Sequence, residues 1–220
     1  MALRNAATHP ASRLRILHWV TLGGVLLTGV LGAWHKRWLC DDAFISFRYA
    51  RNLVEGHGLV YNAGEFVEGY TNFAWTVLMA AGMGLGIEPE KLSTFAGLLS
   101  FVLLILLLLR SSRQMSLDCS LQLSGLPLAA LAWVAHLHAR LFATSGLETM
   151  AFVLLVTCCI VAAIEHWKPW VLGVLGVLAT LMRPDGALIY GLCVLALFVD
   201  AERRAAVRQA GIALLPAVVV

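Results

Sequence analysis

The chain has 220 residues, of which 60% are hydrophobic and 13% are charged, and its mean hydropathy is +0.82. A soluble domain of this size needs more polar surface, so the composition excludes an ordinary soluble protein and indicates an integral membrane protein. The net charge of +3 is small, and no basic patch interleaved with aromatic residues occurs. Nucleic-acid binding is therefore not expected.

The first apolar segment, residues 16–34, follows the basic residues Arg4, Arg13 and Arg15. It is longer than a typical signal-peptide core and lacks a clear A-x-A cleavage site, so we expect an uncleaved transmembrane helix with a cytoplasmic N-terminus. Further apolar stretches lie at 73–87, 95–109, 126–141, 150–164, 170–182, 187–199 and from about residue 211. The predicted fold class is all-α, a polytopic bundle of transmembrane helices formed by residues 1–220.

The segment 73–87 decides the topology, because Gly82, Gly84 and Gly86 crowd its end and weaken it as a spanning helix. If it does not cross, nine of the 16 lysines and arginines lie on the cytoplasmic side; if it crosses, only six do. The nine are Arg4, Arg13, Arg15, Arg110, Arg113, Lys168, Arg203, Arg204 and Arg208. Because cytoplasmic loops carry an excess of positive charge, we predict that 73–87 does not cross. Residues 35–91 then form one extracytoplasmic loop with interfacial helices.

This loop contains a polar segment, 41–72, that starts with the carboxylate pair Asp41 and Asp42. Residues 42–54 have the apolar spacing of an amphipathic helix, which would lie along the membrane surface. One aspartate could cap this helix, which leaves the other free for chemistry. The two carboxylates could also hold Mg²⁺ or Mn²⁺ together, although two adjacent carboxylates alone make an incomplete site.

Five further residues of the loop are candidates for substrate binding: Arg48, Arg51, Glu68, Tyr70 and Asn72. The two arginines either anchor the predicted helix to lipid head groups or form a phosphate clamp, since a guanidinium binds phosphate through two hydrogen bonds. The other three offer hydrogen bonds that either bind a sugar or fix the loop.

Two later turns interrupt the apolar part, T-S-G-L-E at 144–148 and R-P-D-G at 183–186. In the predicted topology both face the same side as Asp41 and Asp42. Glu148 either caps the helix that follows it or contributes to the site. Arg183 and Asp185 either pair with each other within a turn between two helices or bind substrate.

Together these residues resemble the first outer loop of the GT-C glycosyltransferases, which use polyprenyl-phosphate sugars. The pattern DDAFISFRYARNLVEGHGLVYNAGEFVEGYTNFAW is most similar to the branch that contains the mycobacterial terminal arabinofuranosyltransferase. The turns 144–148 and 181–186 resemble motifs of that branch as well. The resemblance covers most of residues 16–199.

The resemblance implies a membrane enzyme of the bacterial plasma membrane, with its active site on the extracytoplasmic face. The first-loop acid, Asp41 or Asp42, would be the general base that deprotonates an acceptor hydroxyl of a glycan, lipid or protein. A single displacement would invert the anomeric centre, and Arg48, Arg51 or Arg183 could stabilise the leaving polyprenyl phosphate. An acid after a later helix lies near the cavity in relatives, and Glu148 matches it by position.

Two non-catalytic alternatives remain open, a protein that binds or flips lipid-linked sugars and a membrane subunit whose polar loop docks a partner. Members of the family usually contain more helices than this chain, and its last apolar stretch carries no flanking charge. We therefore expect either that the sequence is the N-terminal part of a longer transferase or that its last apolar stretch packs against a partner.

Overall fold

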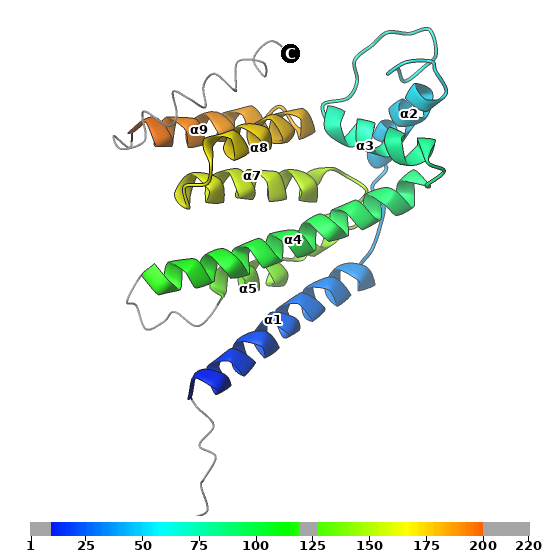
Figure 1. The fold of residues 1–220 in the computed structure, drawn as a ribbon. Helices are drawn as coiled ribbons and strands as arrows, with labels where there is room; N and C mark the ends of the chain where they lie inside the picture. Colours follow the sequence, from blue (N-terminus) through cyan, green and yellow to red (C-terminus); the bar gives the residue numbers. More distant parts are fainter. Residues whose placement is uncertain (1–9, 119–126, 200–220) are drawn as a thin grey trace, which may run out of the picture.

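A computed structural model of the chain describes residues 10–118 and 127–199 (Figure 1). Within these ranges the secondary structure is entirely helical, which confirms the all-α prediction. The helices are α1 (Pro10–His35), α2 (Ala43–Val54), α3 (Phe73–Gly84), α4 (Pro89–Asp118), α5 (Leu128–Ala135), α6 (Leu137–Phe142), α7 (Thr149–Ile164), α8 (Pro169–Met182) and α9 (Gly186–Val199). The apolar stretch predicted from residue 211 lies outside the described residues.

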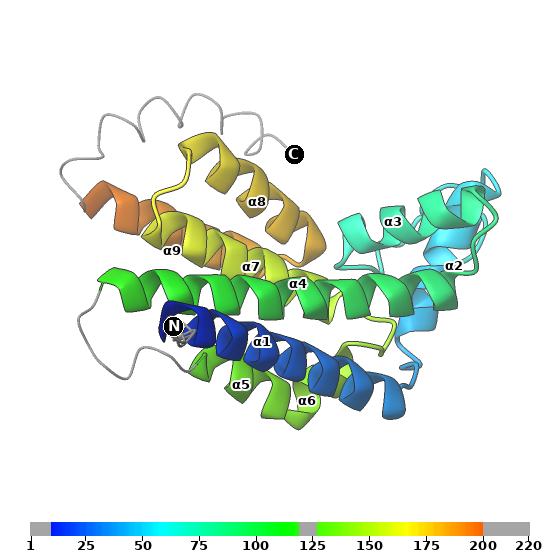
Figure 2. The ribbon, with the colours of Figure 1, turned by 60° about the horizontal axis from the view of Figure 1, so that its bottom comes forward.

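The long helices run side by side, and the short pair α2 and α3 lies at one end of them (Figures 1 and 2). Helix α4 contacts α1, α5 and α7, and α7 in turn contacts α8 and α9. Three apolar clusters hold these contacts: one joins α1, α4 and α5, a second joins α2 and α3 to Met182 of α8, and a third joins α7, α8 and α9. The second cluster fixes the polar first loop onto the end of the bundle.

Glycine and proline mark several of the helix limits, although α1 and α4 extend beyond the predicted apolar segments 16–34 and 95–109. Helix α2 is followed by Gly56 and Gly58, whose positive φ angles of 80° and 85° suit glycine. Pro89 and Pro169 stand at the starts of α4 and α8, where a missing N–H costs nothing. The predicted single segment 126–141 breaks into α5 and α6, because His136 adopts an extended conformation (φ −69°, ψ 116°).

One segment in the described ranges, Pro89–Ser112 of α4, is long and apolar enough to cross a membrane. At 1.5 Å per residue its 24 residues reach about 36 Å, which exceeds the ~30 Å hydrocarbon core of a bilayer. The apolar helices α3, α7, α8 and α9 are shorter than 18 residues. The structure therefore supports one spanning segment by length and composition, and a polytopic bundle stays a prediction.

Candidate functional site

A buried carboxylate, Glu148, is the centre of the polar contacts at the end of the bundle. It lies at the start of α7, but its side chain does not cap that helix. One carboxylate oxygen accepts a hydrogen bond from Nη1 of Arg183 (3.1 Å), and the other accepts one from Nδ2 of Asn72 (2.9 Å). Arg183 also pairs with Asp185 through Nη2 (3.1 Å). The structure thus brings four of the predicted site residues into one cluster.

Asn72 extends this cluster into the first loop. Its Nδ2 also donates to Oγ of Ser46 (2.9 Å), and its Oδ1 accepts a hydrogen bond from Oγ1 of Thr76 (3.1 Å). Ser46, Asn72, Thr76 and Glu148 are all buried. Both ends of the Asn72 amide are therefore occupied by protein partners. Of the two roles predicted for Asn72, the geometry favours fixing the loop over contacting a sugar.

Unlike the buried Asn72 and Glu148, Asp41 and Asp42 are both exposed to solvent. Asp42 occupies the N-cap position of α2, yet its side chain makes no capping hydrogen bond. In residues 10–118 and 127–199, neither carboxylate has a hydrogen-bond or ion-pair partner. Capping therefore does not account for the pair, and both carboxylates are free to meet a substrate.

The backbone holds this acidic pair beside the turn 144–148. The N–H of Cys40, next to Asp41, donates to the carbonyl oxygen of Ser145 (2.8 Å). Gly146 has a φ of 83°, and a Cβ placed on it would lie 2.9 Å from Cβ of Ala43, the residue after Asp42. Nε1 of Trp75 donates to the carbonyl oxygen of the same glycine (3.1 Å). The acidic pair, the Glu148 turn and the start of α3 are thus packed into one unit.

The two arginines of α2 have different surroundings. Nε of Arg48 donates to the carbonyl oxygen of Tyr61 (3.2 Å), so Arg48 supports the following loop. Arg51 lines a cavity of about 280 Å³ between the end of α2 and the α3–α4 turn, together with Glu55 and Glu88. The structure shows no contact that joins the two guanidinium groups into one clamp, so their role in binding phosphate stays a prediction.

Tyr70 packs its ring edge-on against Tyr49 (centroids 5.0 Å apart). Burial, followed by the charges of Glu68 and Tyr49, raises the pKa of Tyr70 above its ordinary value of 10.0. The phenol therefore remains protonated at neutral pH and can donate a hydrogen bond. Glu68 is exposed beside it. Both side chains remain candidates for contact with a sugar.

No group of three or more His, Cys, Asp or Glu side chains able to hold a metal occurs in residues 10–118 and 127–199. Mg²⁺ is commonly held by one or two carboxylates together with water and substrate phosphate. Asp41 and Asp42 could supply those two carboxylates, so binding of Mg²⁺ or Mn²⁺ by this pair stays an open alternative.

Known proteins similar to this chain in sequence include two enzymes of the same name. The chain is 34% identical to the terminal beta-(1->2)-arabinofuranosyltransferase of Mycobacterium tuberculosis over 205 aligned residues, which cover 86% of this chain. The predicted resemblance is confirmed. The enzyme of the same name from Corynebacterium glutamicum is 48% identical over 42 residues, 19% of this chain and 6% of that protein.

The chain spans 32% of the length of the mycobacterial arabinofuranosyltransferase, so the two compare over one part of that enzyme. No family model and no solved structure matches the chain.

Two polar residues of the site were not found from the sequence, Ser46 and Thr76. Ser46 interrupts the apolar pattern of α2, and Thr76 follows Asn72 by one helical turn. Both positions carry a weak signal, because a hydroxyl among apolar neighbours needs a partner when it is buried.

Proposed function

We propose that this chain forms part of a membrane glycosyltransferase that transfers a sugar from a polyprenyl-phosphate donor to an extracytoplasmic hydroxyl. The observation that carries the proposal is the exposed, unpaired pair Asp41 and Asp42, held beside the buried cluster of Glu148 and Arg183. The names of the two relatives support a glycosyltransferase role. The sugar proposed for this chain is an arabinofuranosyl group.

A membrane location is supported by the outward faces of the helices. Large apolar side chains are exposed at helical spacing on α4 and on α9, where Leu188, Leu192 and Leu195 are each more than half exposed. Exposed apolar stripes of this kind occur where a helix faces lipid or another protein. We therefore place α1, α4, the α5–α6 segment, α7, α8 and α9 in the bilayer as a polytopic bundle, with α2 and α3 at its extracytoplasmic surface.

In the proposed reaction, Asp41 or Asp42 accepts the proton of the acceptor hydroxyl. The acceptor oxygen then forms a bond to the anomeric carbon on the face opposite the lipid phosphate, and the bond from that carbon to the phosphate oxygen breaks. One displacement of this kind inverts the anomeric centre. Negative charge grows on the leaving polyprenyl phosphate, where a guanidinium stabilises the transition state more than the ground state.

In this scheme, Arg183 supplies the guanidinium that stabilises the leaving phosphate. Its guanidinium bonds to Glu148 and Asp185 and lies 5.5 Å above the ring centroid of Phe152, so its orientation is fixed before any substrate binds. The side chain is nevertheless 39% exposed, which leaves part of it accessible to a phosphate oxygen. Preorganised charge of this kind lowers the barrier without reorganisation at the moment of reaction.

The proposal is tested by assaying membranes that contain the protein with polyprenyl-phosphoryl arabinofuranose and a glycan acceptor. The expected product carries one added sugar of inverted anomeric configuration relative to the donor. Retention of configuration would contradict the single displacement, and transfer from a nucleotide sugar alone would contradict the lipid-phosphate donor.

A further inference from the structure

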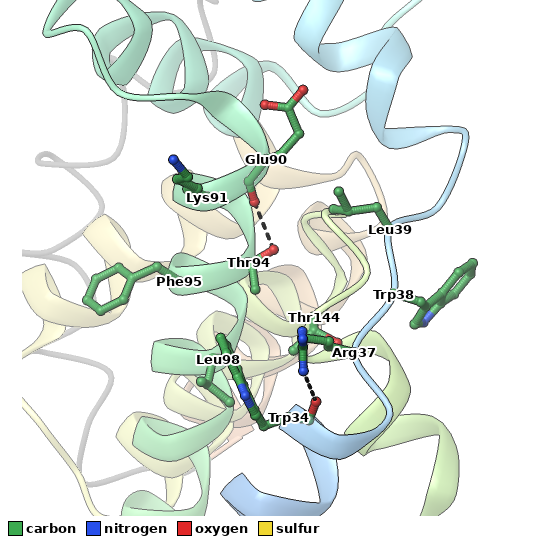
Figure 3. Close-up of a pocket in the computed structure, with 10 residues that line it drawn as sticks. All are labelled: Trp34, Arg37, Trp38, Leu39, Glu90, Lys91, Thr94, Phe95, Leu98 and Thr144. Atoms are coloured by element: carbon green, nitrogen blue, oxygen red, sulfur yellow. Dashed lines mark hydrogen bonds between the residues drawn. The ribbon is translucent and has the colours of Figure 1, made fainter.

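A cavity of about 530 Å³ lies where α1 ends and α4 begins (Figure 3). Its lining comes from the end of α1, from residues 37–39, from the first turns of α4 and from the turn after α6. None of the ten site residues predicted from the sequence lines it. The cavity is therefore a separate feature of the same end of the bundle.

Most of the cavity wall is apolar, formed by Trp34, Leu39, Phe95 and Leu98. The α4 residues belong to the first turns of Pro89–Ser112, the segment long enough to cross a membrane. Tryptophan is enriched where the hydrocarbon core meets the head groups. In the proposed membrane orientation, the cavity opens at the depth where a lipid head group joins its chains.

Arg37 provides a positive charge at this cavity. Its guanidinium lies 4.9 Å from the ring centroid of Trp34, and Nη1 donates a long hydrogen bond to the carbonyl oxygen of Trp34 (3.4 Å). The other N–H groups of the guanidinium have no partner in the described part of the chain. A guanidinium oriented in this way is suited to bind phosphate. Lys91 adds a second cation, which pairs with the exposed Glu88 (2.9 Å).

Thr144 gives an independent indication of a ligand. It lines the cavity and is 1% exposed, and its hydroxyl oxygen has no hydrogen-bond partner in the described residues. Buried hydroxyl groups are nearly always hydrogen-bonded, because an unsatisfied one costs stability. A polar ligand atom in the cavity would satisfy it.

We propose that this cavity binds one phospholipid of the bilayer, with its phosphate at Arg37 and Thr144 and a chain along Trp34, Phe95 and Leu98. The inference rests on the proposed membrane location. The bound lipid is a bilayer component and not the sugar donor, because the cavity contains neither Asp41, Asp42 nor any residue of the Glu148 cluster. The lipid would brace α1 and the 37–40 segment that leads to the acidic pair.

The test is native mass spectrometry of the full chain in detergent, titrated with phosphatidylglycerol or with diacylglycerol of the same chains. We expect one phosphatidylglycerol to bind, and diacylglycerol to bind at least about tenfold more weakly, because it lacks the phosphate that forms charge-assisted hydrogen bonds. Arg37→Gln should weaken phosphatidylglycerol binding about tenfold, and the matched control Lys36→Gln should leave it unchanged. Equal binding of both lipids, or no effect of Arg37→Gln, would overturn the proposal.

Thr144→Val keeps the test informative if Arg37→Gln fails to fold. Because the hydroxyl is unpaired without ligand, this variant should unfold at a higher temperature than the lipid-free wild type. The gain in melting temperature on addition of phosphatidylglycerol should be smaller for this variant than for the wild type. A gain equal to that of the wild type would argue against the lipid contact.

If polyprenyl phosphate displaces phosphatidylglycerol, and Arg37→Gln raises the KM for the donor, the cavity belongs to the donor site and the proposal is wrong. If Asp41 and Asp42 prove not to be catalytic, the lipid-binding results expected here do not change.

Discussion

Glu148 and Arg183 lie 35 residues apart in the sequence and meet at 3.1 Å at the end of the helix bundle. The glutamate side chain is 8% exposed, whereas the arginine side chain is 39% exposed. Glu148 therefore holds the Arg183 guanidinium from its buried side, while part of the guanidinium remains accessible at the surface. The same carboxylate binds Asn72, so it joins the first loop, α7 and the α8–α9 turn.

Replacing Glu148 should destabilise the fold. Glu148→Ala leaves the buried amide of Asn72 and the inner side of Arg183 without their partner, which should cost about 2–3 kcal/mol of unfolding free energy. Glu148→Gln keeps an oxygen for Asn72 and should cost less. Thermal unfolding in detergent measures both, with the exposed Glu65→Ala as the control, expected within about 0.5 kcal/mol of wild type. If Glu148→Ala matches Glu65→Ala, the cluster contributes nothing to stability.

Gly146→Ala should destabilise the site end of the bundle. The residue has a positive φ, and its Cβ would approach Ala43 and Leu39 to 2.9 Å. We expect a loss of about 2 kcal/mol, because a non-glycine residue is strained at this φ. The matched control is Gly84→Ala at the last position of α3, where nothing lies within 4 Å and where alanine should stay within about 0.5 kcal/mol of wild type. Equal melting temperatures for the two variants would contradict the tight packing of Ala43 and Leu39 against Gly146.

The opposite end of the bundle should show a pH dependence. Glu165 accepts hydrogen bonds from Arg110 (2.6 Å), Ser111 (3.1 Å) and Trp167 (3.1 Å). Burial opposes ionisation of Glu165, but these bonds outweigh it and hold its pKa below the ordinary value of 4.5. Because the folded-state pKa is depressed, the contribution to stability is present above pH 4.5 and is lost as the pH falls through the folded-state pKa.

Melting temperatures of wild type and Glu165→Gln between pH 7 and pH 3 measure this contribution. The difference between the two proteins should be largest at neutral pH and should shrink below pH 4.5. A difference that stays constant over this range would contradict the ion pair.

The orientation of the bundle can be tested with single cysteines in a background that has none. Phe66 is 88% exposed in the first loop, and Gln114 is exposed near the far end of α4. An impermeant maleimide added to intact cells should label Phe66→Cys at once. It should label Gln114→Cys only after the membrane is opened. The reverse pattern would place the first loop in the cytoplasm and invert the proposed topology.

Local signals predicted most of the helices. The apolar spacing of 42–54 and the glycines after it defined α2 to within one residue. The break at His136 escaped prediction because neither proline nor glycine marks it. Helix α4 extends beyond its apolar core, 95–109, in both directions, since Pro89 starts it and polar residues continue it to Asp118.

The predicted topology put the candidate residues on one side of the membrane, but the sequence did not predict which of them contact each other. The pairing of Asn72 with Glu148 joins positions 76 residues apart, and no local pattern encodes such a distance. For the same reason the sequence could not separate the buried role of Asn72 from the exposed one of Asp41. The difference arises from packing of α3 against α2 and α4, which exists only in the folded chain.

The most direct test of the account is the turnover of Asp41→Asn and Asp42→Asn in the whole protein, measured beside donor binding. Asparagine keeps the size of the side chain and removes the base. One of the two variants should lose about 10²–10⁴-fold in turnover, the usual contribution of a general base, with donor affinity within about twofold of wild type. The exposed loop acid Glu65, changed to Gln, serves as the control and should keep full activity. Full turnover in both aspartate variants would contradict the account.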